Sequence, residues 1–382
     1  MSEKASARLL DVREVSRDFA EREISAEVAR RIDQKDEYPH DLLRKFSQTG
    51  LVGVNIPEEY GGLGGCTVDA LPIYEELSRR LPVLAWVIGN IMLYGNEIIG
   101  NNGDAEQKRQ YLPALARGER HFSFALTEPE AGSDAANIST RAELRDGCYR
   151  ITGTKIFITG AGVSDVVVTM ARTAPSRYRG ITAFLVNSSA GGFSAHPFDK
   201  LGYRGSNTCE VHYEDVEVAP SEILGGEQCL NQGWSQMMTL LSSERLALAA
   251  CALGIGRGAL DATISYAKSH FPLAGAKGRY QSVQHGLVEM ATELEAARSL
   301  TYHAAAMERQ GMECLKETSM AKFFATETAK RIALRGVEML GEDGGTTECE
   351  LQWFLRDVVA LCIGGGTTEI QKNIVAKTMG LV

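Results

Sequence analysis

One carboxylate lies in an apolar stretch of this sequence, where a solvated acid is out of place. Residues 237–255 are mostly good helix formers without a proline, so they predict a helix. Helical spacing places Glu244 between Leu240 and Leu248, within an apolar stripe. Burial raises the proton affinity of a carboxylate and suits it to remove a proton from a substrate. The alternative is a structural ion pair between Glu244 and a cation such as Arg245.

Three loops bring hydrogen-bond donors to the ends of β-rich runs. In the first, residues 126–134, Thr127 and Ser133 supply hydroxyls, and Gly132 lets backbone amides approach a ligand closely. This chemistry suits phosphates or the polar edge of a ring, and the alternative is a long hairpin loop. The other two loops are residues 157–162 and 201–208.

The composition limits the function classes. The chain has 382 residues, 44% hydrophobic and 23% charged, as in a soluble globular protein of two or three domains. A net charge of −9 without a basic block argues against nucleic acid or an anionic membrane as a partner. The longest apolar runs are too short for a bilayer, and the first residues lack the apolar core of a signal peptide. We therefore expect a cytoplasmic protein.

The eight cysteines are scattered without a Cys-x-x-Cys pair. In a chain without a signal peptide, this indicates reduced thiols and neither disulfides nor a metal site.

The secondary-structure pattern changes twice along the chain. Helical periodicity runs to about residue 116 and returns after 226, with breaks at 271–272 and 341–345. Short β-rich runs lie between these helical parts, at 122–127, 149–153, 155–159, 165–171, 181–186 and 210–218. We expect an α+β chain with a helical domain at 1–120, a β barrel or sandwich at 121–229 and a helical bundle at 230–382. The glycine cluster at 56–65 lacks a preceding buried strand, so it predicts a loop and not a dinucleotide fingerprint.

Several motifs resemble the acyl-CoA dehydrogenases in order and spacing. They are Thr127-Glu-Pro-x-Ala-Gly-Ser-Asp134, Lys155-x-Phe-Ile-Thr159, Leu201-Gly-x-Arg-x-Ser-x-Thr208 and Gly365-Gly-Thr-x-Glu-Ile-Gln371. The resemblance covers nearly the whole chain from residue 56 onward, and several independent motifs in register make it specific.

The resemblance implies a flavoenzyme with an N-terminal helical domain, a middle β domain and a C-terminal four-helix bundle. It implies FAD between the β domain and the bundle, with the ADP end reaching a neighbouring subunit of a homotetramer or homodimer. By position, Leu126 and Thr127 would bind the flavin ring, Thr159 would approach its N5 and O4, and Phe157 would flank it. The other implied cofactor contacts are Phe124, Gly132, Ser133, Gln281, Gly341, Thr367 and Glu369.

The reaction implied by the resemblance is α,β-dehydrogenation of an acyl thioester, in which a glutamate takes the α proton and the flavin takes the β hydrogen as hydride. Many members carry this base in the loop before the last helix, where this chain has Gly365. A smaller branch, including isovaleryl-CoA and long-chain acyl-CoA dehydrogenases, carries it on a bundle helix just before an arginine. Glu244-Arg245 matches that position, and Glu244 is the predicted base. Ser133, Arg245, Gly365 and Gly366 are the predicted substrate contacts.

Two regions depart from the family pattern. His270 replaces an arginine that serves the cofactor pyrophosphate, although Gln281 does match. Glu338 replaces a glutamine, and Glu342 brings negative charge into the following turn. Because acids repel a pyrophosphate, we expect FAD to bind less firmly, by about 10- to 100-fold for one lost charge-assisted contact.

Two further functions remain open at this stage. The same base could dehydrogenate an acyl or aminoacyl group held on a carrier protein, or the chain could be a non-catalytic homologue with weakened FAD binding. The acceptor of the electrons would be an electron-transfer flavoprotein or oxygen. The seven histidines are scattered, and none forms a nucleophile–base pair with a serine or cysteine motif.

Overall fold

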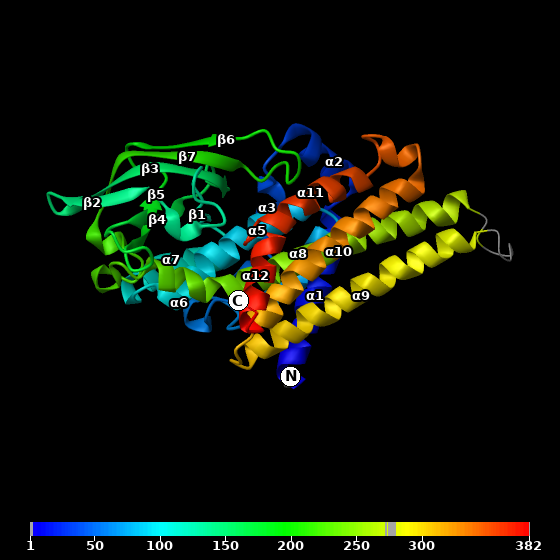
Figure 1. Cartoon of the computed structure of the whole chain (residues 1–382), viewed down its shortest axis with the longest axis horizontal. Helices are drawn as coiled ribbons and strands as arrows, with labels where there is room; N and C mark the ends of the chain where they lie inside the picture. The colour runs from blue at the N-terminus through cyan, green and yellow to red at the C-terminus, as the bar shows by residue number, and fades with distance from the viewer. Residues whose placement is uncertain (1–2, 272, 274–279, 382) are drawn as a thin grey trace.

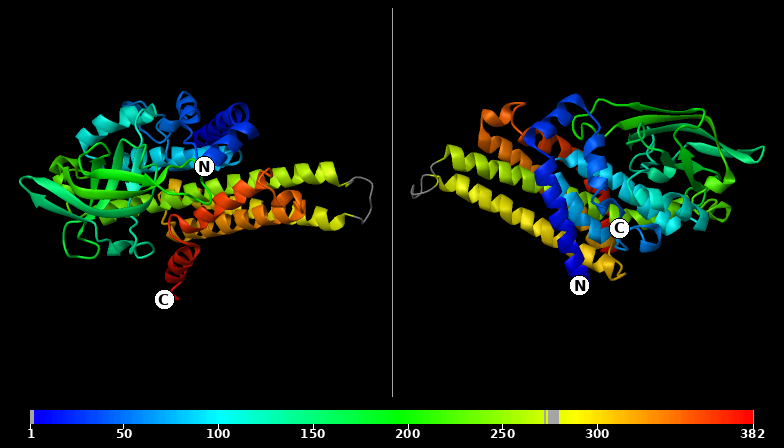
Figure 2. Two further views of the ribbon diagram at one scale, coloured as in Figure 1. Left: turned by 90° about the horizontal axis from the view of Figure 1, so that it is seen from above. Right: turned by 180° about the vertical axis from the view of Figure 1, so that it is seen from behind.

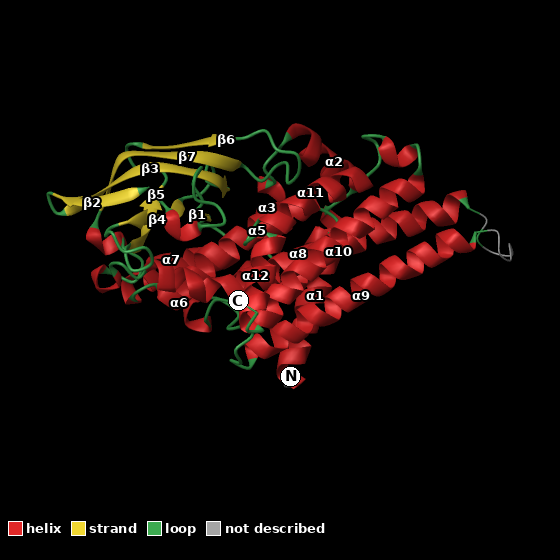
Figure 3. Cartoon of the chain, in the orientation of Figure 1, coloured by secondary structure: helices red, strands yellow, loops and turns green. Residues whose placement is uncertain are grey.

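The computed structural model describes residues 3–271, 273 and 280–381. Helices come first, a β-sheet follows and a second set of helices ends the chain (Figures 1 and 3), which confirms the predicted fold class. The N-terminal helices are α1 (Glu3–Glu23), α2 (Ala26–Lys35), α3 (His40–Ser47), α4 (Thr67–Ser78), α5 (Pro82–Gly89), the π-helix η3 (Asn90–Glu97), α6 (Ile98–Asn102) and α7 (Ala105–Ala116).

Local sequence signals explain several of these boundaries. The Ser25 side chain accepts the Val28 N–H at the start of α2, and Asp104 with Gln107 forms a capping box at the start of α7. The glycine cluster at 56–65 is a loop around a short 3₁₀ turn, as predicted. The π-helix was not predicted, because its apolar periodicity does not distinguish it from the α-helices on either side.

The middle segment is one curled sheet. Its strands are β1 (Phe122–Ala125), β2 (Arg141–Arg145), β3 (Cys148–Thr159), β4 (Val166–Arg172), β5 (Ile181–Asn187), β6 (Phe193–Pro197) and β7 (Thr208–Val218). Their order is β1-β4-β2-β3-β7-β6, with β5 paired to β4. Two predicted runs, 149–153 and 155–159, join into β3, because β-bulges absorb the irregular positions. Strands β2 and β6 were not predicted, because β2 is mostly exposed and β6 has no buried residue, so neither shows a clear apolar alternation.

The last helices form the bundle. They are α8 (Gly233–His270), α9 (Gln281–Arg309), α10 (Leu315–Leu340), α11 (Leu351–Ile363) and α12 (Thr368–Thr378). Helices α8, α9 and α10 run side by side away from the sheet, and α12 projects from the body of the molecule (Figure 2). The breaks predicted near 271 and 341 are present, since α8 ends at His270 and α10 ends at Leu340.

The N-terminal helices and the bundle share one hydrophobic core, and the sheet encloses a second. Helix α8 lies at the centre of the first core, where Leu246, Ala249 and Ile255 are fully buried. Two helical stretches, Pro82–Asn102 and Gly233–His270, are long and apolar enough to cross a membrane by length and composition. Both lie largely inside the protein, with 83% and 72% of their most apolar windows buried, so packing within the core explains their composition.

Candidate active site

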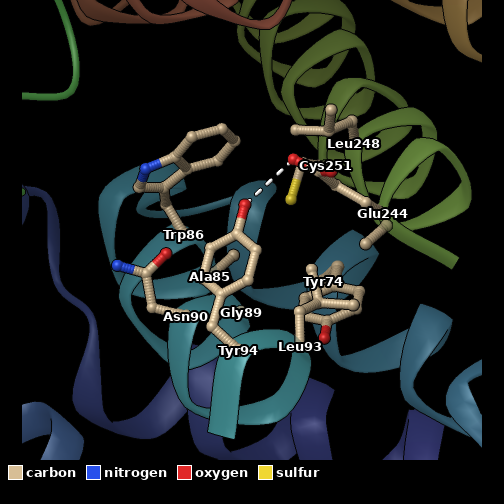
Figure 4. Close-up of a pocket in the computed structure, with 11 residues that line it drawn as sticks. Tyr74, Ala85, Trp86, Gly89, Asn90, Leu93, Tyr94, Glu244, Leu248 and Cys251 are labelled. Atoms are coloured by element: carbon tan, nitrogen blue, oxygen red, sulfur yellow. Dashed lines mark hydrogen bonds between the residues drawn. The ribbon is translucent and has the colours of Figure 1, made fainter. Parts of the chain in front are cut away.

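A cavity lies between α8 and the helices α4, α5 and η3, and its empty space, counted together with the solvent at its mouth, is about 300 Å³. Figure 4 shows the side chains that line it, with the Glu244 carboxylate facing the hydroxyl of Tyr94. Apart from the Asn90 amide, the remaining wall is apolar or aromatic and is formed by Tyr74, Ala85, Trp86, Gly89, Leu93, Ala247, Leu248 and Cys251. The cavity therefore contains one acid in a largely apolar wall.

The protonation of Glu244 is controlled by burial, by one hydrogen bond and by two nearby cations. Burial raises its pKa, while the hydrogen bond from Tyr94 and the positive charges of Arg245 and Lys322 lower it. The Tyr94 hydroxyl donates to Glu244 Oε1 at 2.9 Å. Within the described residues, Arg245 forms no ion pair with Glu244, and two of its guanidinium nitrogens have no hydrogen-bond partner, so the structural Glu244–Arg245 pair considered from the sequence is not formed. A buried carboxylate with a raised pKa that lines a largely apolar cavity is suited to general-base catalysis.

The glycine-rich loop before α12 passes directly beside this carboxylate. A Cβ atom built on Gly365 would lie 3.7 Å from Glu244 Oε1 and 2.4 Å from Leu248 Cδ1. Gly365 and Gly366 have φ values of +62° and +90°, which favour glycine. The buried Lys322 amine donates to the Gly366 carbonyl at 2.8 Å and fixes the loop to α10. In this family the base lies either in the loop before the last helix or on a bundle helix, and the corresponding residues here, Gly365 and Glu244, are neighbours in space.

The predicted flavin-ring contacts lie together at the ends of β1 and β3. The Ile156 N–H donates to the Thr127 carbonyl at 2.9 Å, and the buried Lys155 amine donates to the Leu126 carbonyl at 2.8 Å. Phe157 lies in the β-bulge between them with φ of +58° and a side chain that is 66% exposed. A strained backbone that presents an exposed aromatic ring is typical of a ligand site. These features fit the face of a flavin ring.

Trp86 joins this row of residues to the cavity. Its indole N–H donates to Thr159 Oγ1 at 3.1 Å, and the Asn90 amide donates to the Thr159 carbonyl at 2.9 Å. Both side chains also line the cavity that contains Glu244. Phe124 stacks on Tyr94 with ring centroids 5.3 Å apart. The family resemblance assigns Thr159 to the reactive edge of the flavin. Only the Trp86 side chain lies between Thr159 and the cavity that contains Glu244.

The remaining predicted contacts are more scattered. Gly132 and Ser133 are exposed on the loop after β1, and Arg245 is 4% exposed, with two of its guanidinium nitrogens lacking a hydrogen-bond partner. Thr367 accepts the Ile370 N–H as the N-cap of α12, and the exposed Glu369 follows in its first turn. These residues do not line the cavity.

A separate group lies where α8, α9 and α10 end or begin, away from the sheet (Figure 1). Gln281 starts α9, Gly341 ends α10, and the His270 ring stacks on Tyr266 with centroids 3.8 Å apart. Tyr266 also donates to Asp343 at 2.8 Å. The group lies at the opposite end of the bundle from β3, the strand that ends in Thr159 (Figure 1), so a cofactor role for it would involve a second chain. The weaker FAD binding expected from His270, Glu338 and Glu342 stays a prediction, and residues 274–279 beside it lie outside the described part.

Four residues of the site were not predicted from the sequence: Trp86, Asn90, Tyr94 and Lys322. The pattern of the first three could have indicated them, because Trp86, Asn90 and Tyr94 recur every four residues and would lie on one face of a helix. Each brings an N–H or O–H donor into a largely apolar stretch. Lys322 had no signal, since a lysine within a helix normally faces water.

Comparison with known proteins adds the family. Three family models match in succession: the acyl-CoA dehydrogenase N-terminal domain at residues 6–119, the middle domain at 123–216 and the C-terminal domain at 231–380. The chain is 39% identical to an acyl-CoA dehydrogenase of Bacillus subtilis, covering 96% of both chains. It is 34% identical to the caffeyl-CoA reductase–Etf complex subunit CarC of Acetobacterium woodii, again over 96% of both. The solved butyryl-CoA dehydrogenase of Megasphaera elsdenii is 29% identical, with a TM-score of 0.92, covering 99% of this chain and 98% of that one.

The fold and the site define an oxidoreductase of a flavoprotein class that acts on acyl-CoA. The chain belongs to the acyl-CoA dehydrogenase family, as the motifs in its sequence indicated.

Proposed function

We propose that this chain dehydrogenates an acyl-CoA thioester between its α and β carbons, with Glu244 as the base and FAD as the cofactor. The observation that carries the assignment is the position of Trp86, which contacts Thr159 and lines the cavity that contains Glu244. A compact acyl group in this cavity would have the acid on one side and the flavin-binding edge of the β domain on the other.

The residues of the chain divide the work as follows. Glu244 takes the α proton, and the apolar wall excludes water from the charge that develops. Residues 126–127, Phe157 and Thr159 would hold the flavin ring, which supplies the acceptor for the β hydrogen as hydride. Gly365 has no side chain, so the loop before α12 can pass close to Leu248 and the Glu244 carboxylate. We expect Arg245 and Ser133 to act at the edge of the substrate site.

The direct test is anaerobic titration of the flavin-loaded protein with a panel of acyl-CoA thioesters and thioesters held on a carrier protein. Bleaching of the flavin should occur with acyl-CoA, and Glu244→Gln should bind the same thioester but bleach at least about 100-fold more slowly. Glu308→Gln is the matched control, because Glu308 is another largely buried acid that does not line the cavity. Wild-type bleaching in Glu244→Gln would refute the base assignment, and bleaching by carrier-bound thioesters alone would change the substrate class.

We propose an electron-transfer flavoprotein as the electron partner. The proposal is supported by the relative whose name places it in a complex with Etf. Substrate-reduced protein should pass electrons to such a flavoprotein faster than to oxygen, as measured by the absorbance of the acceptor. An oligomer is also proposed, because Gln281 and Gly341 could reach a flavin only in a neighbouring chain.

A further inference from the structure

Tyr94 is held at both ends by different parts of the molecule. Its ring stacks on Phe124 of β1, with centroids 5.3 Å apart and planes at 19°. Its hydroxyl donates to Glu244 Oε1 of α8 at 2.9 Å. The side chain is therefore fixed between the strand that leads to the flavin loop and the helix that carries the acid. Such a double constraint leaves the hydroxyl little freedom to turn elsewhere.

The backbone under Tyr94 is unusual. Asn90–Glu97 is a π-helix that continues directly from α5 and into α6. A π-helix of this length is rare and less favourable than an α-helix, and such segments occur mostly at functional sites. Asn90, at its start, contacts Thr159, and Tyr94, one turn later, contacts Glu244. The wider turn sends these two side chains toward the cofactor edge and the acid, respectively.

The charges around Glu244 come from four helices. Arg245 of α8 and Lys322 of α10 favour its ionised form. Glu97 of η3 repels it, and Glu308 of α9 lies behind Glu97, sharing Ser243 as a neighbour. Tyr74 of α4 is buried and neutral. Within the described residues, Tyr94 is the only group that donates a hydrogen bond to the Glu244 carboxylate.

We propose that Tyr94 is a positioning residue whose hydroxyl orients the Glu244 carboxylate and favours its ionised form. This inference rests on the proposed function, in which only the ionised carboxylate can accept the α proton. Burial favours the protonated acid, whereas a hydrogen bond donated to the carboxylate favours the anion. Because Tyr94 is itself buried and its pKa lies well above its ordinary value, it keeps its proton and stays a donor across the working pH range.

The test compares Tyr94→Phe with the wild-type, flavin-loaded protein. Infrared spectroscopy reports the C=O band of protonated Glu244, identified by its disappearance in Glu244→Gln, as a function of pH. Loss of the donor should move the midpoint of this band upward by about one pH unit, as expected for one hydrogen bond to a charged group. The acid limb of flavin bleaching by acyl-CoA should move by the same amount.

Tyr74→Phe is the matched control. Tyr74 is also a buried tyrosine that lines the cavity, but its hydroxyl has no hydrogen-bond partner. Its removal should leave the Glu244 midpoint unchanged. If Tyr94→Phe does not fold, Tyr94→3-fluorotyrosine keeps the ring and strengthens the donor, and the midpoint should then move downward.

An unchanged midpoint in Tyr94→Phe, or an equal shift in Tyr74→Phe, would overturn the proposal. Failure of the proposed function is a separate result, because Glu244→Gln would then bleach like the wild type. The infrared midpoint would still report whether Tyr94 controls the protonation of Glu244.

Discussion

At the scale of single residues, the site depends on what position 365 lacks. The missing side chain of Gly365 leaves room for Leu248 and for the Glu244 carboxylate, which lie 2.4 and 3.7 Å from where its Cβ would be. A second acid at this position would lie beside the first and would raise its proton affinity by repulsion. Glycine in the loop and glutamate on α8 are therefore two parts of one arrangement.

We predict that Gly365→Ala lowers the free energy of unfolding by about 1–2 kcal/mol because of its φ of +62° alone. The contact of the new Cβ with Leu248 should lower it further. Gly311→Ala is the control, since Gly311 has φ of +67° with nothing within 4 Å of its added Cβ. Thermal unfolding of both variants measures the difference. Equal losses of stability would mean that Leu248 moves aside without cost. Slower flavin bleaching in Gly365→Ala alone would show that the loop also controls the substrate site.

At the scale of elements, a buried ion pair supports the loop between β1 and β2. Lys155 and Glu128 are 0% and 3% exposed, and their charged atoms are 2.8 Å apart. Glu128 also accepts the backbone N–H groups of Ser139 and Thr140. Burial raises the pKa of Glu128, whereas the Lys155 cation and the hydrogen bonds from Thr140 and Ser139 lower it. The net result is a pKa of about 2. Because the Lys155 amine also contacts the Leu126 carbonyl, the pair fixes the predicted flavin contacts.

We predict that Lys155→Met destabilises the protein by about 3–5 kcal/mol, because it leaves the Glu128 carboxylate buried without its cation. Retention of flavin through gel filtration should fall with it. Arg177→Met is the control, since its ion pair with Asp134 is more than half exposed and should contribute less than about 1 kcal/mol. Chemical unfolding of both variants gives the comparison. A Lys155→Met variant as stable as the control would contradict the supporting role.

At the scale of the whole molecule, the β domain meets the bundle where the loop at 201–208 lies on α11. The buried Asp357 carboxylate accepts the Tyr203 N–H at 2.5 Å, and Arg356 donates to the Leu201 carbonyl at 2.6 Å. Arg356 also pairs with Asp33 of α2 at 2.6 Å, so three segments meet here. Burial raises the pKa of Asp357 to about 7. The native protein therefore binds a proton at this seam more tightly than the unfolded chain does.

The sign of the pH effect follows from this raised pKa. The contribution of Asp357 to stability is fully present below about pH 4 and is lost as the pH rises to about 7. We predict that Asp357→Asn removes this loss. The free energy of unfolding of the variant, relative to that of the wild type, should then rise by on the order of 3–4 kcal/mol between pH 4 and pH 8. Chemical unfolding at both pH values tests it. A constant difference between variant and wild type would show that Asp357 does not titrate in this range.

The sequence predicted the three-part fold and the family, and it assigned the base to Glu244 because the loop at Gly365 has no acid. These depend on local periodicity and on motifs that keep their spacing along the chain, as at Glu244 and Gly365. It also placed Thr127, Phe157 and Thr159 in one neighbourhood through the same motifs. It missed β2 and β6, because exposed strands have no apolar face to mark them.

Only the tertiary structure decided what surrounds the acid. The sequence showed that Glu244 stands in an apolar stripe, and that pattern alone favoured a structural pair with a cation such as Arg245. The structure brings Tyr94 to it from a helix 150 positions earlier in the chain. It also brings Lys322 of α10 near the acid. Trp86 of α5, which lines the same cavity, donates a hydrogen bond to Thr159. The physical reason is that electrostatics and hydrogen bonding act through space, between groups whose separation along the chain leaves no periodic signal.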